Sequence, residues 1–316
     1  MAHALWRPGE HLLNADSRQV YRGMDIATAK PTRAERLAYP WELLDLRDPR
    51  EPFTAKDWLD EASAAWAAGG VCWAVGGTSF YFDVLAHGLF EQAEIPPGAR
   101  ERLAVLMGRG LAALRDEVVR RDPEYAQGAD LQNPRRLERA FLAMEVSGRK
   151  YSELRLERRA PPIRLRMAVL FLPRKTIYNR IEARVAAMLA GGLLDETRAL
   201  LKSGVPESAP AMTGIGYAEA AGHLAGRLAL GEVRERMVLR TRQFARRQVG
   251  AFRRFQGATF VDLSGAPPGS DAEDAWFYRL PLAVRGEPIP EGGARLPAET
   301  RPAEALRQMM EETHAA

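Results

Sequence analysis

Short apolar runs alternate with longer segments of helical periodicity along this chain. The continuous apolar run at 71–75 has the pattern of a parallel strand that is buried on both faces, and the mostly apolar run at 165–172 predicts a further strand of the sheet. Between and after them, apolar residues recur at helical spacing, as in the segment with Ile181 and Val185 on one face, for which Thr176 is the expected N-cap. This alternation predicts an α/β fold, with a parallel sheet flanked by helices.

A long stretch without any strand pattern separates the two apolar runs. Its periodicity is helical throughout, it opens after Pro96, and Asn133 followed by Pro134 is a helix start signal. The chain beyond Leu263 is rich in Pro and Gly and lacks sustained periodicity. The expected layout is an α/β core over 1–96 and 161–263, a helical insertion over 97–160, and a loosely structured tail over 264–316.

Composition is that of an ordinary globular protein, with 316 residues, 46% hydrophobic and 27% charged. No apolar run of about eighteen residues is present, and the first residues lack a signal-peptide pattern, so no membrane association is expected. The single cysteine, Cys72, rules out an internal disulfide and fits a reducing, cytoplasmic environment. The five histidines show no metal-ligand spacing, which predicts that there is no zinc site.

The net charge of +4 is concentrated in two clusters. Residues 133–166 hold ten basic side chains against four acids, and residues 234–254 hold eight arginines against Glu235 alone. Arginines without matching acids favour phosphate groups, because the guanidinium fork matches phosphate geometry. Both clusters therefore point to a polyanion as partner. A solvated basic face remains the alternative reading of each.

Polar and basic groups crowd the stretch 14–32, which follows the apolar pair at 12–13 and contains Asp16. Open α/β sheets place their ligands in strand-end loops, so this stretch is a candidate active site. Gly76, Gly77 and Thr78 follow another strand directly, in the layout of an anion or substrate loop. A tight turn between strand and helix is the competing interpretation of that motif.

Several segments in collinear order carry a family resemblance. They are 16–26 with 28–32, 75–78, 133–140 with 148–149, 178–201, and 215–217 with 245–248 and 252–253. Over roughly 12–263 the chain resembles the tRNA dimethylallyltransferases (tRNA isopentenyltransferases). The resemblance implies a P-loop-NTPase-like parallel sheet with a helical insertion domain. It also implies transfer of a dimethylallyl group from dimethylallyl diphosphate, with Mg²⁺, to N6 of the tRNA adenosine immediately 3′ of the anticodon, position 37.

The resemblance also implies roles for individual residues. Asp16 matches the family's general base, and Thr213 lies at a loop position linked to the diphosphate, where relatives often carry Arg or Gln. The remaining matches are expected to contact the anticodon stem-loop of the tRNA, which a monomer would bind. Ser17, Arg18 and Gln19 would read the target base, Thr78 and Arg100 would contact tRNA at the pocket rim, and Arg135, Arg136, Arg139, Arg246, Arg247, Gln248 and Arg253 would grip its backbone.

The chain departs from the family pattern at its start. Members normally carry a P-loop, a Gly-rich turn ending in Gly-Lys-Ser/Thr, about twenty to thirty residues before the Asp-Ser motif. Only fifteen residues precede Asp16, and they contain no such motif. We expect that the start site was assigned too late. The alternatives are an inactive tRNA-binding relic of the family, or a nucleotide kinase-like phosphotransferase, against which the missing P-loop counts more heavily.

Overall fold

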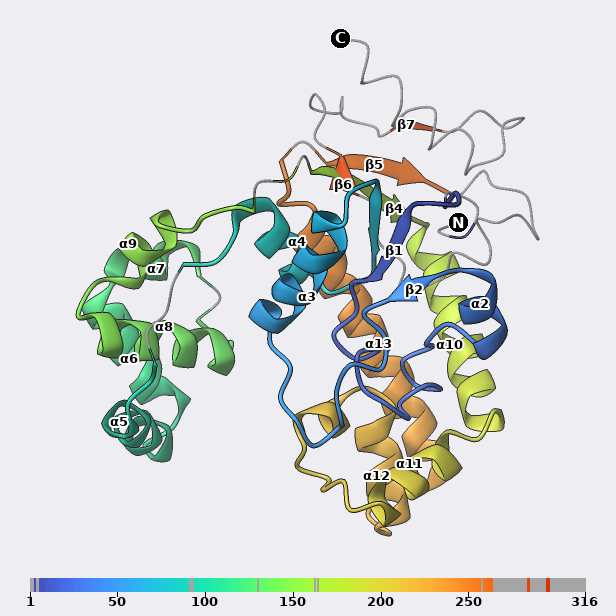
Figure 1. Ribbon diagram of the computed structural model, residues 1–316. Helices are drawn as coiled ribbons and strands as arrows, with labels where there is room; N and C mark the ends of the chain where they lie inside the picture. The colour runs from blue at the N-terminus through green and yellow to red at the C-terminus, as the bar shows by residue number, and fades with distance from the viewer. Residues whose placement is uncertain are drawn as a thin grey trace. The chain divides into compact units, whose positions relative to one another are not determined.

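The structure, a computed structural model, describes residues 3, 6–90, 94–129, 131–161, 163, 165–256 and 258–263, together with the backbone of 283–284 and 294–295. The chain divides into two compact units, one formed by Met1–Asp83 with Arg164–Ala316 and the other by Val84–Ile163. Figure 1 labels their elements. In chain order these are β1 (His11–Asn14), α2 (Arg33–Ala38), β2 (Trp41–Glu42), α3 (Ala55–Ala67), β3 (Cys72–Val75), α4 (Ser79–His87), α5 (Pro97–Gly108), α6 (Leu111–Arg121), α7 (Pro123–Gly128), α8 (Pro134–Ser147), α9 (Tyr151–Leu156), β4 (Arg166–Phe171), α10 (Arg174–Ala190), α11 (Leu193–Lys202), the 3₁₀ turn η1 (Pro210–Thr213), α12 (Tyr217–Leu224), α13 (Leu230–Phe252), β5 (Thr259–Asp262), β6 (Ala283–Val284) and β7 (Ala294–Arg295).

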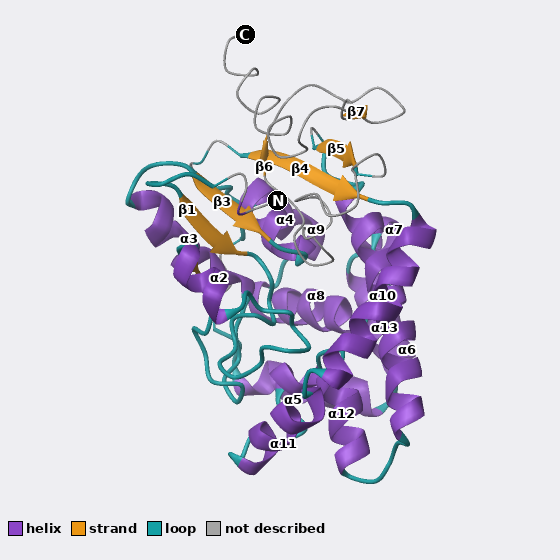
Figure 2. Ribbon diagram, turned by 90° about the vertical axis from the view of Figure 1, so that its right-hand side faces the viewer, coloured by secondary structure: helices purple, strands orange, loops and turns teal. Residues whose placement is uncertain are grey.

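The described strands form two sheets rather than the single sheet that the sequence pattern predicted. The first has the order β2-β1-β3 and is parallel, and Figure 2 shows β1 and β3 side by side. The second has the order β6-β4-β5-β7, in which only β6 is antiparallel to its neighbour. Leu12 and Trp73 of the first sheet share one buried cluster with Ala168 and Val261 of the second, so the two sheets bury their apolar residues together.

Helices α10 to α13 enclose the largest buried cluster of the first unit, and α10 packs along α13 (Figure 1). The chain segment after β1 contributes to this cluster, since Val20 and Met24 are fully buried in it. The segment is therefore fixed by core packing although it has no helix or strand of its own. Its neighbours in the core include Ile181 and Val185, as their spacing predicted.

The start of α10 differs from the prediction. The N-cap is Pro173 rather than Thr176, which lies within the first helical turn. The cause is local, because β4 ends at Phe171 and the proline has a φ of −55°, which already suits a helix entry. The helix therefore begins as soon as the strand ends.

The second unit contains α5 to α9 packed around a core of its own. Asn133 caps α8 through its side chain, as predicted, and Phe141 and Met144 of that helix are buried. The helical periodicity that begins after Pro96 is divided between α5 and α6, because Gly110 between them has a φ of +100°. Leu114 is fully buried, whereas Leu103 is only partly buried.

Candidate active site

Asp16 stands two residues beyond the end of β1, and its backbone is fixed by Asn14. The Asn14 amide nitrogen Nδ2 donates to the carbonyls of Asp16 and Leu43 at 3.0 Å each, and its Oδ1 accepts from the Asp16 N–H at 3.0 Å. The indole Nε1 of Trp58 on α3 donates to the Asn14 carbonyl at 2.8 Å. Asn14 lies within the predicted site stretch 14–32, but neither Asn14 nor Trp58 was given a role from the sequence, although an amide two residues before the carboxylate was a usable signal.

The Asp16 side chain is buried, with 5% of its surface exposed. Burial raises the pKa of its carboxyl, while the N–H and the charge of Arg18, followed by the Gln19 N–H and the charge of Arg184, act to lower it. The Arg18 N–H donates to Asp16 Oδ1 at 2.7 Å. The net effect is a carboxyl group that holds a proton more readily than an exposed aspartate does, which suits a general base.

The Gly-Gly-Thr turn after β3 supports the Asp16 loop directly. The Ala15 N–H donates to the Val75 carbonyl at 2.8 Å, and the Thr78 N–H donates to the Ala15 carbonyl at 3.2 Å. The Thr78 hydroxyl accepts from the Ser17 N–H at 2.9 Å. A Cβ at Gly76 would stand 2.2 Å from the Ala15 carbonyl carbon, so only glycine fits there. The turn thus fixes the backbone on both sides of Asp16.

Arg18 links this loop to the η1 turn. Its Nη1 donates to the Pro210 carbonyl at 2.6 Å and its Nη2 donates to the Thr213 hydroxyl at 3.3 Å. The Thr213 hydroxyl in turn donates to the Pro210 carbonyl at 2.8 Å, and Arg240 of α13 donates to the Thr213 carbonyl at 3.2 Å. Two expected site residues, Arg18 and Thr213, are therefore brought together, and the positive charge of Arg18 acts on Asp16.

Two glutamines that were expected to contact RNA are buried and donate hydrogen bonds to backbone carbonyls. Gln19 is 6% exposed and donates to the Thr28 carbonyl at 3.0 Å, so it secures the following loop. Gln248 is also 6% exposed and donates to the Gly77 carbonyl at 2.9 Å. In this structure both amides hold backbone carbonyls of neighbouring loops, and their expected contacts with RNA stay predictions.

The arginines of α13 fall into two groups. Contrary to the expectation of arginines without matching acids, three are ion-paired: Arg236 with Glu232, Arg240 with Glu219 and Arg242 with Glu182. The acids come mostly from other helices, which the local charge count left out. Exposed guanidinium groups that pair with no residue described in the structure belong to Arg234, Arg246 and Arg247 of α13 and to Arg253 and Arg254, which directly follow it.

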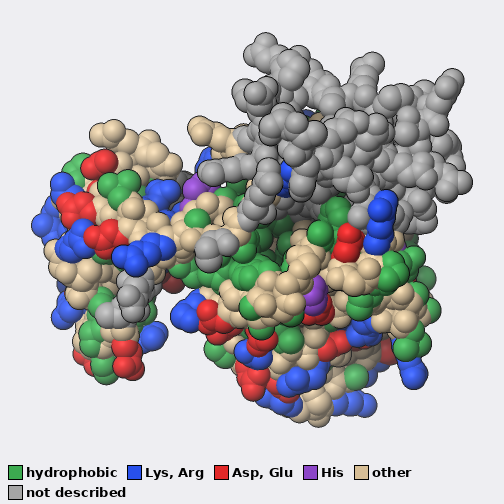
Figure 3. Space-filling view, turned by 45° about the horizontal axis from the view of Figure 1, so that its top comes forward, with side chains coloured by type: hydrophobic (Ala, Val, Ile, Leu, Met, Phe, Trp, Pro, Cys, Tyr) green, Lys and Arg blue, Asp and Glu red, His purple; other side chains and the backbone are tan. Residues whose placement is uncertain are grey.

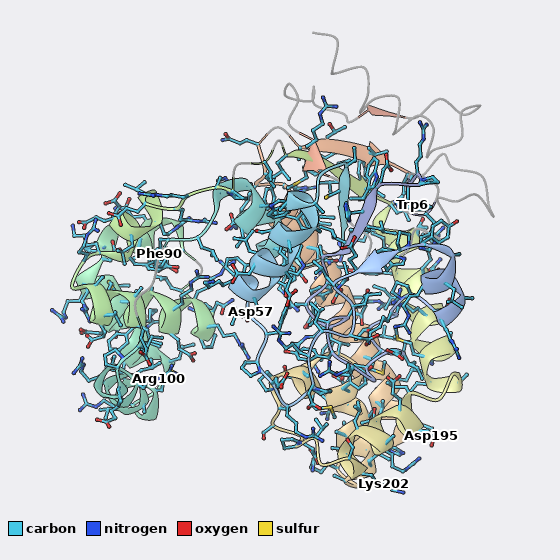
Figure 4. All side chains as sticks on the ribbon, viewed as in Figure 1. Trp6, Asp57, Phe90, Arg100, Asp195 and Lys202 are labelled. Carbon is cyan, nitrogen blue, oxygen red and sulfur yellow. The ribbon has the colours of Figure 1, made fainter. Side chains whose placement is uncertain are left out.

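The second unit carries the other predicted RNA contacts. Arg100 on α5 and Arg135 and Arg136 on α8 are exposed, and Figure 4 labels Arg100 and Phe90 within this unit. Arg139 instead lies with its guanidinium over the Phe90 ring, 5.7 Å from the centroid. On the face shown in Figure 3, basic and acidic side chains are interspersed, so a uniform basic field is not seen from that side.

Three further observations limit the chemistry of the described residues. They contain no group of three or more His, Cys, Asp or Glu side chains that could hold a metal ion. None of their helices is long and apolar enough to cross a membrane. Cys72 is half-buried, and burial raises the pKa of its thiol to about 11, which makes it a poor nucleophile at neutral pH.

The model of the IPP transferase family matches residues 19–255. A curated relative from Roseiflexus sp. (strain RS-1), named tRNA dimethylallyltransferase, is 41% identical over 252 residues, 77% of this chain and 81% of the relative. The chain belongs to the IPP transferase family. A second relative of the same name, from Anaeromyxobacter sp. (strain K), is 41% identical over 271 residues, 83% of this chain and 86% of its own.

Solved structures agree with this membership of the IPP transferase family. The full-length tRNA isopentenylpyrophosphate transferase from Bacillus halodurans has a TM-score of 0.60 and 30% identity, covering 86% of this chain and 88% of its own. A eukaryotic dimethylallyltransferase acting on tRNA has a TM-score of 0.63 at 23% identity, covering 83% and 70%, and supports the fold alone. The predicted P-loop-NTPase-like α/β fold is therefore confirmed.

Proposed function

We propose that this protein transfers a dimethylallyl group from dimethylallyl diphosphate to N6 of the tRNA adenosine immediately 3′ of the anticodon, position 37, with Asp16 as general base. The observation that carries the proposal is a buried carboxyl of raised pKa in the strand-end loop of an IPP transferase family member. The names of the relatives supply the reaction class.

The chemistry explains why a buried base is useful. The adenine amine is a weak nucleophile, because its lone pair is delocalised into the ring. As N6 bonds to C1 of the dimethylallyl group, the C1–O bond breaks and its electron pair leaves with the diphosphate. One N6 proton passes to an Asp16 carboxylate oxygen. A carboxyl whose pKa is raised by burial accepts that proton more readily than an exposed aspartate does.

The fixed loop geometry supports the same role. Asn14 and the Arg18 N–H hold the backbone and one carboxylate oxygen of Asp16, so its reorientation before reaction is limited. Ser17, next to it, is half-buried and donates its N–H to Thr78, while its hydroxyl has no hydrogen bond to a described residue, so we assign it the base contact proposed for this loop. The Arg18 guanidinium joins this loop to η1 through its hydrogen bond to the Pro210 carbonyl.

Backbone binding of the tRNA is assigned to exposed arginines. Arg246, Arg247 and Arg253 of the α13 region, with Arg100, Arg135 and Arg136 of the helical unit, are exposed and well suited to phosphate contacts. The described carboxylates do not form a protein-built magnesium cage, so the proposal assigns no step to Mg²⁺, which remains an implication of the family. The Thr213 hydroxyl accepts from Arg18 and donates to the Pro210 carbonyl, so we assign it no diphosphate contact.

A transfer assay tests the proposal. The purified chain is incubated with radiolabelled dimethylallyl diphosphate and a tRNA transcript that carries adenosine 3′ of the anticodon. The expected result is label in the tRNA and a dimethylallyl-adenosine after nuclease digestion and mass spectrometry. A matched transcript with guanosine at that position should take up no label. Tight tRNA binding without any transfer would instead favour the non-catalytic relic.

A further inference from the structure

Two guanidinium groups from different helices lie over one aromatic ring at the surface of the first unit. The ring belongs to Tyr178 of α10. The guanidinium carbon of Arg174, on the same helix, lies 5.1 Å from the ring centroid, and that of Arg242, on α13, lies 4.6 Å from it. The two positive groups are therefore no further apart than these two distances together. Like charges repel at that range, so this surface attracts anions unless nearby acids offset the charge.

Nearby acids offset only part of this charge. Glu182 pairs with Arg242, and the Glu182 side chain is 48% exposed. Arg174 donates through Nε to the Tyr178 hydroxyl at 3.0 Å, which fixes the guanidinium group but adds no negative charge. Arg174 and the next residue, Lys175, are exposed, and neither forms an ion pair with a carboxylate in the part of the chain that the structure describes. The terminal nitrogens of Arg174 and the Lys175 ammonium group can therefore meet an anion.

A further exposed arginine extends the positive charge along α13. Arg246 follows Arg242 by four residues, which places the two side chains on one side of the helix. The helices α10 and α13 pack together, and Figure 1 shows that α10 leaves β4 whereas α13 returns toward β5, so they run in opposite directions. Arg246 therefore lies toward the start of α10. We call the set Arg174, Lys175, Arg242 and Arg246 the α10–α13 surface.

We propose that the α10–α13 surface binds the phosphate backbone of the tRNA, with Arg174 and Lys175 as contacts that were not predicted from the sequence. The identity of the RNA rests on the proposed function. Exposed basic side chains on two packed helices suit an extended polyanion, because successive phosphates can each meet one of them. Small ligands such as free diphosphate are mostly buried in pockets. The Tyr178 ring holds two guanidinium groups in place, so less side-chain freedom is lost when RNA binds.

The test is the double variant Arg174→Ala/Lys175→Ala, which removes two exposed charges and leaves the core intact. The affinity for a tRNA transcript is measured from about 50 to 200 mM salt. Each lost phosphate contact lowers the slope of log K against log salt by about 0.7–0.9, so we expect a slope lower by roughly 1.4–1.8. At about 0.1 M salt this corresponds to an affinity loss of roughly 25- to 60-fold. In transfer assays the KM for tRNA should rise, whereas kcat at saturating tRNA should not change.

A control variant removes the same charge elsewhere. Arg198→Ala/Lys202→Ala takes two positive charges from α11, and Figure 4 labels Lys202 at the end of the first unit that lies away from β4. This control should keep the wild-type slope and the wild-type KM for tRNA. A wild-type slope in Arg174→Ala/Lys175→Ala would overturn the proposal and leave a solvated basic face.

The remaining outcomes separate the two phosphate sources and the two levels of inference. A wild-type slope in the double variant, together with weaker binding of inorganic diphosphate, would overturn the proposal in favour of a diphosphate site. Binding is measured without transfer, so the proposed function is tested apart from the surface. A chain that shows the expected change in slope but transfers no dimethylallyl group would sink the proposed function and support the α10–α13 surface.

Discussion

Substituting Gly76 by alanine tests the claim that the turn after β3 fixes the backbone beside Asp16. The new Cβ would lie 2.2 Å from both the carbonyl carbon and the oxygen of Ala15, where an ordinary contact begins at 3.4 Å. The Ala15 backbone would have to retreat by about 1 Å, and it cannot yield as a flexible side chain does. Overpacking of this kind costs about 1–3 kcal/mol, or roughly 2–12 °C in melting temperature for a domain of this size.

The same displacement should impair activity more than stability, because a misplacement of about 1 Å at a reacting group can cost about 100-fold in rate. Thermal unfolding and single-turnover transfer are measured on Gly76→Ala beside Gly231→Ala. A Cβ at Gly231 in the first turn of α13 meets no atom within 4 Å, so that control should be neutral or slightly stabilising. A Gly76→Ala protein with wild-type melting and rate would refute the reasoning that this turn positions Asp16.

Other substitutions have defined outcomes. Arg240→Ala removes the ion pair of the Glu219 carboxylate, whose side chain is 4% exposed, and should lower the free energy of unfolding in urea by about 2–4 kcal/mol. Arg236→Ala breaks an exposed pair within α13 and should lower it by under about 0.5 kcal/mol. Burial raises the pKa of Asp16, so ionisation of that group lowers the free energy of unfolding as the pH rises through its folded pKa. Asp16→Asn should therefore be more stable than wild type at pH 8. The difference in unfolding free energy should close as the pH falls toward 3.8, the ordinary pKa of an aspartate. Arg247→Ala should weaken tRNA binding and reduce the slope of log K against log salt by about 0.7–0.9, whereas an unchanged slope would mean that this side chain meets no phosphate.

Much of the fold follows from the sequence because its signals are local. The apolar runs predicted β3 and β4, and Asn133 caps α8 as its position before Pro134 predicted. The start of α10 was missed because a proline beside a strand end outweighed the hydroxyl of Thr176. The division of strands between two sheets depends on pairing across long sequence separations, which periodicity does not encode.

In the candidate site too, the sequence predicts features that depend on neighbouring residues and misses contacts between distant segments. Asp16 could be predicted as a site residue because a polar stretch after a strand is visible in the sequence. The partners of Gln248 and Arg240 lie in other segments, and Arg240 pairs with a glutamate on α12. A charge count along one helix does not include an acid that lies on another helix.

Single-turnover transfer by Asp16→Asn measures the central claim most directly. The asparagine keeps the size of the side chain and an oxygen that can accept the Arg18 N–H, so the loop and tRNA affinity should be preserved. We expect the transfer rate to fall by at least 100-fold with an unchanged dissociation constant for tRNA, since general bases contribute about 10²–10⁴-fold. A rate within a few-fold of wild type would contradict the assignment of Asp16 as the base that takes the proton from the adenine amine.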